Sequence, residues 1–91
     1  MRFEWDEAKR RSNVRRHGID FVDADQVFAG ETITFLDDRY DYRETRFLTF
    51  GLLWGEVVAI VHLETDEVIR VISIRRASKD EEETYFKEVR D

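Results

Sequence analysis

Two runs of mainly apolar residues lie between Val57 and Ala77, and four polar residues separate them. Valine and isoleucine dominate both runs and favour extended structure, so the pattern predicts a β-hairpin with a short loop. The first run is apolar almost throughout, which is typical of a strand covered on both faces. The second run alternates, and strict alternation places Ile69, Val71 and Ser73 on one face and Ile74 on the other.

Three shorter segments upstream also have the composition of strands. Residues 3–5 alternate around aromatic side chains, while residues 32–36 and 44–51 are rich in threonine, phenylalanine and leucine. A turn near Trp54 and Gly55 leads from the last of these segments into the hairpin. Consecutive strands with such short connections favour an antiparallel meander.

The ends of two helices are marked in the first third of the chain. Asp6 can accept a backbone hydrogen bond at the start of a helix over residues 7–16, and Gly18 supplies the left-handed conformation that ends it. Asp20 has the same capping role for a second helix, which Gly30 ends. Apolar residues recur at helical spacing through the second helix, so we expect it to pack on the sheet.

A third helix follows the hairpin, where Ser78 and Glu81 have the spacing of a capping box and a narrow apolar stripe includes Tyr85. The resulting order of elements is β-α-α-β-β-β-β-α. It predicts an α+β fold in which an antiparallel sheet of about four to five strands carries two N-terminal helices and one C-terminal helix. We expect residues 1–91 to form a single domain, because the chain is too short for a second core.

Composition excludes several classes of protein. The chain has no cysteine, so it has neither disulfides nor a thiolate metal site. Its net charge of −6 argues against general binding to nucleic acid. No apolar run is long enough to cross a membrane, and charged residues interrupt the segment where a signal peptide would lie. We therefore expect a cytoplasmic protein without membrane association.

Basic residues mark the ends of several predicted elements. They are Arg16 and His17 at the end of the first helix, Arg46 near the start of a strand, and Arg75 and Arg76 at the end of the last strand. Cleavage of a phosphodiester without a metal ion needs cations that stabilise the developing negative charge, and guanidinium groups suit this role. Salt bridges to the many carboxylates of the chain explain the same arginines equally well.

Three side chains are candidates for proton transfer, namely His17, Glu44 and Tyr85. His17 is the leading candidate because imidazole ordinarily titrates near neutral pH. The other histidine, His62, lies within an apolar strand and is predicted to be a packed core or partner-face residue. Neither histidine has a carboxylate at a metal-ligand spacing, so no metal site is predicted. The loop at residues 37–43 interleaves arginine with tyrosine, which can stack on bases, but its aspartates would repel phosphate.

Two blocks of sequence resemble the BrnT family of bacterial toxins, and together they span nearly the whole chain. The first block consists of Phe3-Glu4-Trp5-Asp6, Lys9, Asn13, Arg16-His17-Gly18, Phe21, Ala24, Val27 and Phe28. The second consists of Glu44, Arg46, residues 69–78, Glu81 and Tyr85. The resemblance implies a fold similar to that of the RelE-type ribonucleases, with metal-independent RNA cleavage, no cofactor, and growth arrest.

The resemblance also implies partners and site residues. The expected partner is a ribbon-helix-helix antitoxin similar to BrnA, in a heterotetramer built on an antitoxin dimer, and operator DNA is contacted only through the antitoxin. We predict that Arg75 and Arg76 hold the scissile phosphate of the RNA substrate. Arg16 would assist them, and His17 would transfer a proton. Further RNA contacts are predicted for Lys9, Arg46, Arg70 and Tyr85.

The chain departs from the family pattern at three places. Thr65 stands where the family has an arginine, and Ile74 stands where it has a small alanine. The last helix carries Glu82 and Glu83 where the family is usually basic. Fewer cations near a phosphate site weaken RNA binding. A second hypothesis is therefore a toxin fold with little or no nuclease activity, which serves mainly as antitoxin partner and transcriptional co-repressor.

Overall fold

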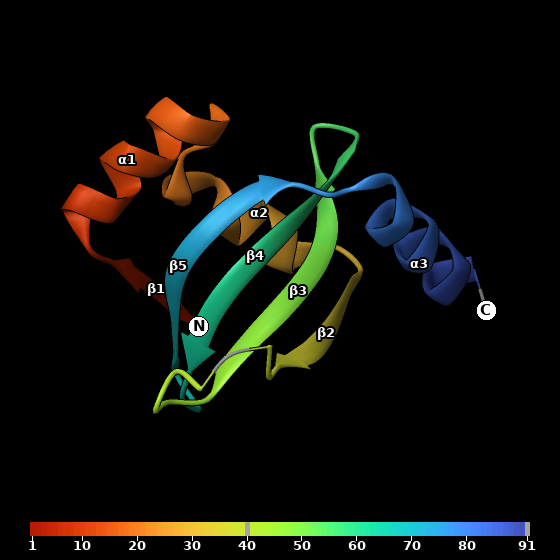
Figure 1. Ribbon diagram of the computed structural model, residues 1–91. Coiled ribbons are helices and arrows are strands. Elements are labelled where there is room, and N and C mark those ends of the chain that lie inside the picture. Colours follow the sequence, from red (N-terminus) through yellow and green to blue (C-terminus); the bar gives the residue numbers. More distant parts are fainter. Residues whose placement is uncertain (40, 91) are drawn as a thin grey trace.

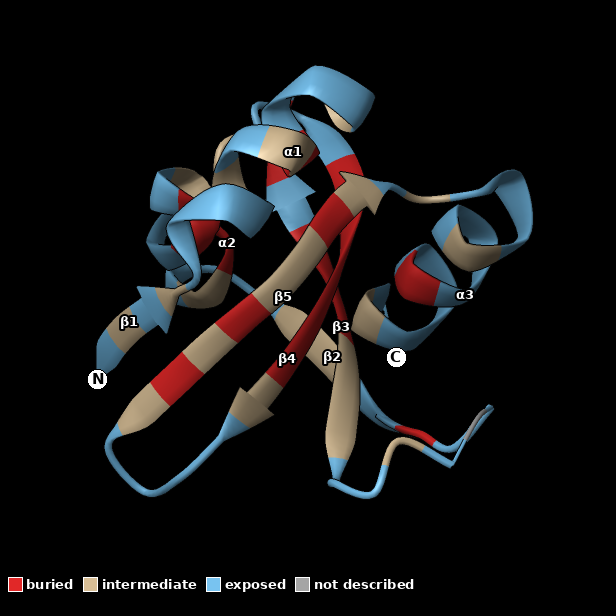
Figure 2. Cartoon of the chain, turned by 60° about the vertical axis from the view of Figure 1, so that its left-hand side comes forward, coloured by how far each residue is buried: buried red, intermediate tan, exposed pale blue. Residues whose placement is uncertain are grey.

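The strands of the protein are β1 (Arg2–Trp5), β2 (Thr32–Asp37), β3 (Arg46–Leu53), β4 (Glu56–Glu64) and β5 (Val68–Arg76). In the computed structural model, which describes residues 1–39 and 41–90, they form one sheet in the order β1-β5-β4-β3-β2 (Figure 1). Strands β2 to β5 follow one another as the predicted antiparallel meander. Buried residues run along most of the central strand β4 (Figure 2), as its nearly uninterrupted apolar sequence predicts.

Helices cover both faces of the sheet. α1 (Glu7–His17), a 3-10 turn at Phe21–Asp23 and α2 (Ala24–Ala29) lie on one face, and α3 (Lys79–Arg90) packs on the other. In Figure 1, α2 crosses behind the sheet and α3 lies beyond the end of β5. The predicted order of elements is confirmed, with the refinement that the second helical segment starts as a 3-10 turn.

Strand β1 differs from the expectation of a wholly antiparallel sheet. It pairs with β5 in parallel, with Phe3 opposite Ile69 and Trp5 opposite Val71. The chain leaves β1 through α1 and reaches β5 only after three further strands, so the parallel pairing requires no tight turn. The sheet is therefore mixed, and β1 and β2 form its two edges.

A β-bulge in β5 changes which of its residues face α1 and α2. The pairing of β4 with β5 shifts at Val61 and His62, and Ile72 is the extra residue. A single extra residue reverses the alternation of the strand beyond it. Val71 and Ile74 consequently lie in the same buried cluster. The prediction that Ile74 faces away from Val71 is wrong for this reason.

Each face of the sheet has its own buried cluster. The larger one lies beneath α1 and α2 and consists of Ile19, Phe21, Ala24, Val27, Leu53, Val58, Ile60, Ile69, Val71 and Ile74. The smaller one lies beneath α3 and is built around Tyr85, which is 1% exposed. Since apolar burial is the main attraction between elements, Tyr85 is the principal anchor of α3.

The predicted helix ends are confirmed. Asp6 caps α1 by accepting a hydrogen bond from the backbone N–H three residues on, at 3.1 Å, and Gly18 ends the helix with a φ of 70°. Asp20 accepts a backbone hydrogen bond of 3.1 Å at the start of the 3-10 turn. The capping box of α3 forms in both directions, because Ser78 N–H donates to Glu81 at 2.8 Å and Glu81 N–H donates to Ser78 Oγ at 3.2 Å.

Asn13 joins α1 to β5 through buried hydrogen bonds. Its Nδ2 donates to the carbonyl oxygens of Ile19 and Ile74 at 2.9 and 2.8 Å, and its Oδ1 accepts from the Ile74 N–H at 3.1 Å. The neighbouring strand β1 ends at Trp5, opposite Val71. Asn13 therefore supplies the hydrogen bonds that a longer β1 would make to β5.

His62 is a packed core residue, as predicted, and is 1% exposed. Its Nε2 lies 2.7 Å from the hydroxyl of Thr49, which in turn lies 2.8 Å from the hydroxyl of Thr34. The ring stacks on Phe47 and meets Phe28 edge-on, with centroid distances of 5.8 and 5.2 Å. Burial lowers the pKa of His62 to about 4, so the ring is neutral at physiological pH.

A substitution at Gly51 is expected to destabilise the contact between α2 and β3. A Cβ atom at Gly51 would lie 2.6 Å from Val27 Cγ1 and 3.1 Å from Thr32 Cγ2. We expect Gly51→Ala to lower the free energy of unfolding by about 1–3 kcal/mol, measured by urea denaturation. In a Val27→Ala background the same substitution should cost less, because the clashing methyl group is gone. If Gly51→Ala lowers the free energy of unfolding equally in both backgrounds, Val27 is not the residue that clashes.

Candidate functional site

The last strand places Arg75 on the face of the sheet that α3 partly covers. Its guanidinium forms two parallel hydrogen bonds with the carboxylate of Glu81, with Nη1–Oε1 at 2.6 Å and Nη2–Oε2 at 2.9 Å. The two side chains are 31% and 21% exposed. The hydrogen bonds from Arg75 lower the pKa of Glu81 to about 2, and the carboxylate raises the pKa of Arg75. This charge-assisted pair fixes the guanidinium in one orientation.

A second arginine–carboxylate pair lies at the end of β2. Asp37 is 5% exposed and accepts hydrogen bonds from Arg39 Nε at 2.8 Å and Nη2 at 3.0 Å. The hydroxyl of Tyr42 donates to the same carboxylate at 3.3 Å. These bonds, chiefly those from Arg39, lower the pKa of Asp37. Both members of the pair act electrostatically on Arg75, so β2 and β5 contribute charges to one surface.

Two further arginines complete this surface. Arg46 pairs with Glu44 at 3.0 Å, and its guanidinium carbon lies 4.1 Å from the centre of the Tyr42 ring. Arg70 of β5 pairs with Glu4 of the neighbouring strand β1 at 3.4 Å. We use the term arginine face for this set of guanidinium groups: Arg39, Arg46, Arg70 and Arg75. Each of these four arginines forms an ion pair with its own carboxylate, and the four carboxylates lie in four different segments of the chain.

A shallow hollow lies at the β2–β3 end of the arginine face. It has a volume of about 400 Å³ and is lined by residues 36–38 and 41–46. Arg46 and Tyr42 are both in its lining, which places a cation and an aromatic ring side by side. Such a combination can hold a nucleobase by stacking and a phosphate by charge. Tyr40, the other tyrosine of this loop, lies outside the described residues.

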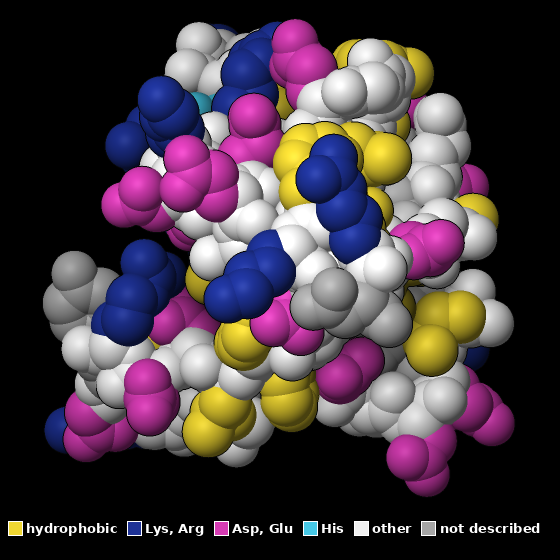
Figure 3. Space-filling model, turned by 90° about the vertical axis from the view of Figure 1, so that its right-hand side faces the viewer, with side chains coloured by type: hydrophobic (Ala, Val, Ile, Leu, Met, Phe, Trp, Pro, Cys, Tyr) yellow, Lys and Arg dark blue, Asp and Glu magenta, His cyan; other side chains and the backbone are white. Residues whose placement is uncertain are grey.

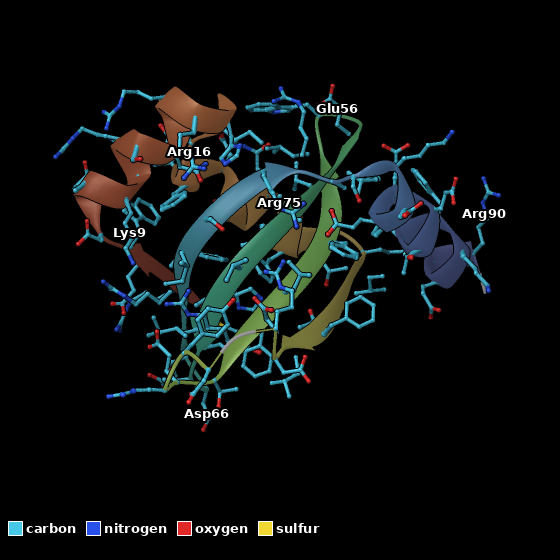
Figure 4. The ribbon with its side chains drawn as sticks, viewed as in Figure 1. Lys9, Arg16, Glu56, Asp66, Arg75 and Arg90 are labelled. Carbon is cyan, nitrogen blue, oxygen red and sulfur yellow. The ribbon has the colours of Figure 1, made fainter. Side chains whose placement is uncertain are left out.

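Arg76 belongs to a different surface. Consecutive strand residues point to opposite faces, so it leaves the sheet on the side opposite Arg75. Its Nη1 donates to the carbonyl oxygen of His17 at 2.9 Å, and its Nε lies 2.9 Å from Glu56 Oε2. Arg76 therefore caps the end of α1 through the His17 backbone. Figure 4 shows Arg16 on α1, apart from Arg75. The structure brings Arg76 to His17 and separates both from Arg75.

Two of the predicted RNA contacts lie elsewhere. Lys9 is exposed on the first half of α1, away from Arg75 in Figure 4. Tyr85 is buried, and its hydroxyl donates to the carbonyl oxygen of Glu31 at 2.9 Å. Burial also raises the pKa of Tyr85. In this conformation Tyr85 is a structural residue that does not reach the surface.

Sequence reasoning did not identify Asp37, Arg39 and Glu81 as parts of one surface. Glu81 was predicted only as a helix cap, although it also binds Arg75. The Asp37–Arg39 pair has a local signal, since an acidic residue at a strand end precedes an arginine by two positions. What brings the pairs together is the sheet order and the position of α3, which no local pattern encodes.

The functional groups of the arginine face suit a phosphodiester ligand. It offers fixed cations, carboxylates that can accept protons, and an aromatic ring. Within residues 1–39 and 41–90, no group of three or more histidine or acidic side chains is placed to hold a metal ion. None of the helices in that described part of the chain is long and apolar enough to cross a membrane.

A protein-family model matches most of the chain. It is described as "Ribonuclease toxin, BrnT, of type II toxin-antitoxin system" and matches residues 5–81. The matched segment includes Arg39, Arg46, Arg70 and the complete Arg75–Glu81 pair. No curated protein matches the sequence.

Proposed function

The chain belongs to the BrnT family of ribonuclease toxins of type II toxin–antitoxin systems, and from this premise we propose that it is a metal-independent endoribonuclease that cleaves mRNA and stops translation in the bacterial cytoplasm. The arginine face is the proposed RNA-binding surface. Arg75, beside α3, holds the scissile phosphate. Arg46 and Tyr42 receive the neighbouring nucleotide in the hollow beside them.

The observation that carries this proposal is the bidentate contact between Arg75 and Glu81. A phosphate presents two oxygens to a guanidinium with the same geometry as a carboxylate. An RNA phosphate that takes the place of the carboxylate would bind Arg75 in the same bidentate geometry, and the cost of breaking the Arg75–Glu81 pair opposes this binding. In that position Arg75 stabilises the negative charge that develops as the phosphodiester is attacked.

Proton transfer has candidates on both sides of β5. Glu44 lies on the arginine face beside Arg46, whereas His17 lies near Arg76 at the end of α1. An RNA strand that passes over the end of β5 would contact Arg75 first and then Arg76. The cations Arg76 and Arg16 would then hold the flanking phosphate, and His17 would be within the path of the strand.

The test is cleavage of an end-labelled single-stranded RNA by the purified chain in the presence of EDTA. We expect cleavage by the wild type and a loss of about 100-fold or more in Arg75→Ala, as for removal of one group that stabilises transition-state charge. Arg90→Ala is the matched control, because this arginine lies at the far end of α3 in Figure 4, and it should cleave as the wild type does.

Two outcomes separate the alternatives. If Arg76→Ala and His17→Ala abolish cleavage while Arg75→Ala does not, the reaction takes place at the end of α1 and the arginine face is not the site. If the wild type leaves RNA intact, the second candidate function holds, which is a toxin fold that acts as antitoxin partner and co-repressor. That candidate is favoured by the ion pairs that hold every guanidinium of the arginine face.

The family implies a protein antitoxin as partner. We propose that this partner is a ribbon-helix-helix dimer that carries two toxin chains in a heterotetramer and contacts operator DNA itself. The net charge of −6 on the toxin supports an indirect role in DNA binding. Light scattering of the purified complex measures its mass, and a mass other than two chains of each kind would contradict the stoichiometry.

A further inference from the structure

The two edges of the sheet differ in how they are protected. β1 is 4 residues long and carries Arg2 and Glu4, which are both exposed. β2 is 6 residues long, and its residues 32–36 carry no charge, no proline and no bulge. Exposed edge strands normally carry such features because their free backbone groups can pair with another strand. The β2 edge therefore has the properties of a strand that accepts a partner.

Side chains along β2 are also exposed. Phe35 and Leu36 are 42% and 59% exposed and point to opposite faces of the sheet. In the sheet order, β3 lies on one side of β2, and no other strand of the described part of the chain lies on its outer side. Figure 3 looks onto the side of the molecule that carries α3 and β2, and hydrophobic side chains are visible there between charged ones.

The ends of this edge are acidic. Glu31 precedes β2 and Asp38 follows it, both are exposed, and neither is in an ion pair with another described residue. A second copy of the chain would be a poor partner, because antiparallel pairing of two β2 strands brings Glu31 of one chain near Asp38 of the other. A strand with an uncharged centre and basic ends is complementary to the edge.

We propose that β2 is the docking edge for an extended segment of the antitoxin, which adds a sixth strand to the sheet. Apolar side chains of that segment contact Phe35 and Leu36, and lysine or arginine at its ends lies beside Glu31 and Asp38. The proposal rests on the type II partner given above but not on nuclease activity. Because Asp37 ends β2 and binds Arg39 just beyond it, a bound segment ends beside the arginine face.

The first test uses the wild-type protein. Hydrogen exchange of its backbone amides is measured alone and in complex with the antitoxin co-expressed from the adjacent reading frame. We expect exchange within residues 32–37 to slow by about tenfold or more in the complex, because added strand hydrogen bonds protect amides. Amides of β1 should be unchanged. Unchanged exchange in β2, or slow exchange in β2 of the free chain together with a dimeric mass, would overturn the proposal.

The second test places charge on the edge. The double variant Phe35→Lys, Leu36→Lys should bind the same antitoxin about tenfold or more weakly, since both exposed apolar contacts are lost and like charges meet. Val22→Lys is a control at a position that is 52% exposed on the 3-10 turn, outside the β2 edge, and it should bind normally. Equal affinity of the double variant overturns the proposal. RNA cleavage by the wild type without antitoxin tests the proposed nuclease separately.

Discussion

Asn13→Ala is expected to lower the free energy of unfolding by about 3–5 kcal/mol, the largest effect of any single polar substitution considered for this fold. The change removes three buried hydrogen bonds at once. It also leaves the carbonyl oxygen and the N–H of Ile74 without the partner that replaces β1 at this point of β5. Urea denaturation monitored by tryptophan fluorescence measures the loss, because Trp5 lies at the end of β1.

Two variants control this prediction. Ser12→Ala changes the preceding residue of α1 and should cost less than about 1 kcal/mol, as substitutions that break no buried network do. Asn13→Asp keeps an acceptor for Ile74 N–H but turns a carboxylate oxygen toward two carbonyl oxygens, so it should destabilise at least as much as alanine at neutral pH. An Asn13→Ala protein as stable as Ser12→Ala would show that α1 and β5 are held by apolar packing alone.

His62 should make the stability of the protein depend on pH between about 6.5 and 4. Its pKa falls from 6.5 to about 4 on folding, because burial disfavours the charged ring. The unfolded chain therefore binds the proton more readily than the folded one. The stabilisation is fully present above pH 6.5 and is lost as the pH falls toward 4, by about 3 kcal/mol in total.

Urea denaturation at pH values from 7.5 down to 5 measures the first part of this loss, about 2 kcal/mol. The Arg75–Glu81 pair does not interfere, because the pKa of Glu81 falls from 4.5 to about 2 on folding and its contribution is lost only at lower pH. In His62→Gln the ring no longer titrates, so the variant should be less stable at pH 7.5 but show a flatter dependence on pH. The same slope in both proteins would contradict the assignment to His62.

Much of the fold could be predicted from the sequence because its signals are local. Asp6, Gly18 and the Ser78–Glu81 box mark helix ends through contacts within four residues. The alternation and apolar content of the meander strands specify their type without reference to the rest of the chain. The parallel pairing of β1 could not be predicted, because β1 and β5 lie far apart in sequence. The bulge at Ile72 lies within the β4–β5 hairpin, and the alternation of β5 carries no residue signal that marks it.

The candidate site was harder to predict for the same reason. Arg46, Arg70 and Arg75 were identified because arginines in a strand are conspicuous. Arg46 meets a carboxylate two residues away, but nothing local tells which carboxylates Arg70 and Arg75 meet. Glu81 lies six residues from Arg75, and Glu4 lies 66 residues from Arg70. Strand alternation predicts Arg75 and Arg76 on opposite faces, and the structure places them so, with Arg75 at α3 and Arg76 at the end of α1.

The bulge at Ile72 determines which face of the sheet each residue at the end of β5 occupies. With the extra residue, Arg75 meets α3 and Arg76 meets the end of α1. Regular pairing of the same strand, with Ile72 opposite Val61, would place Arg75 opposite Val58, so its guanidinium would turn toward the first helix and that of Arg76 toward the third. A one-residue irregularity thus assigns each cation to its side, so a strand of the same length that paired without the bulge would keep both arginines yet present them on exchanged faces.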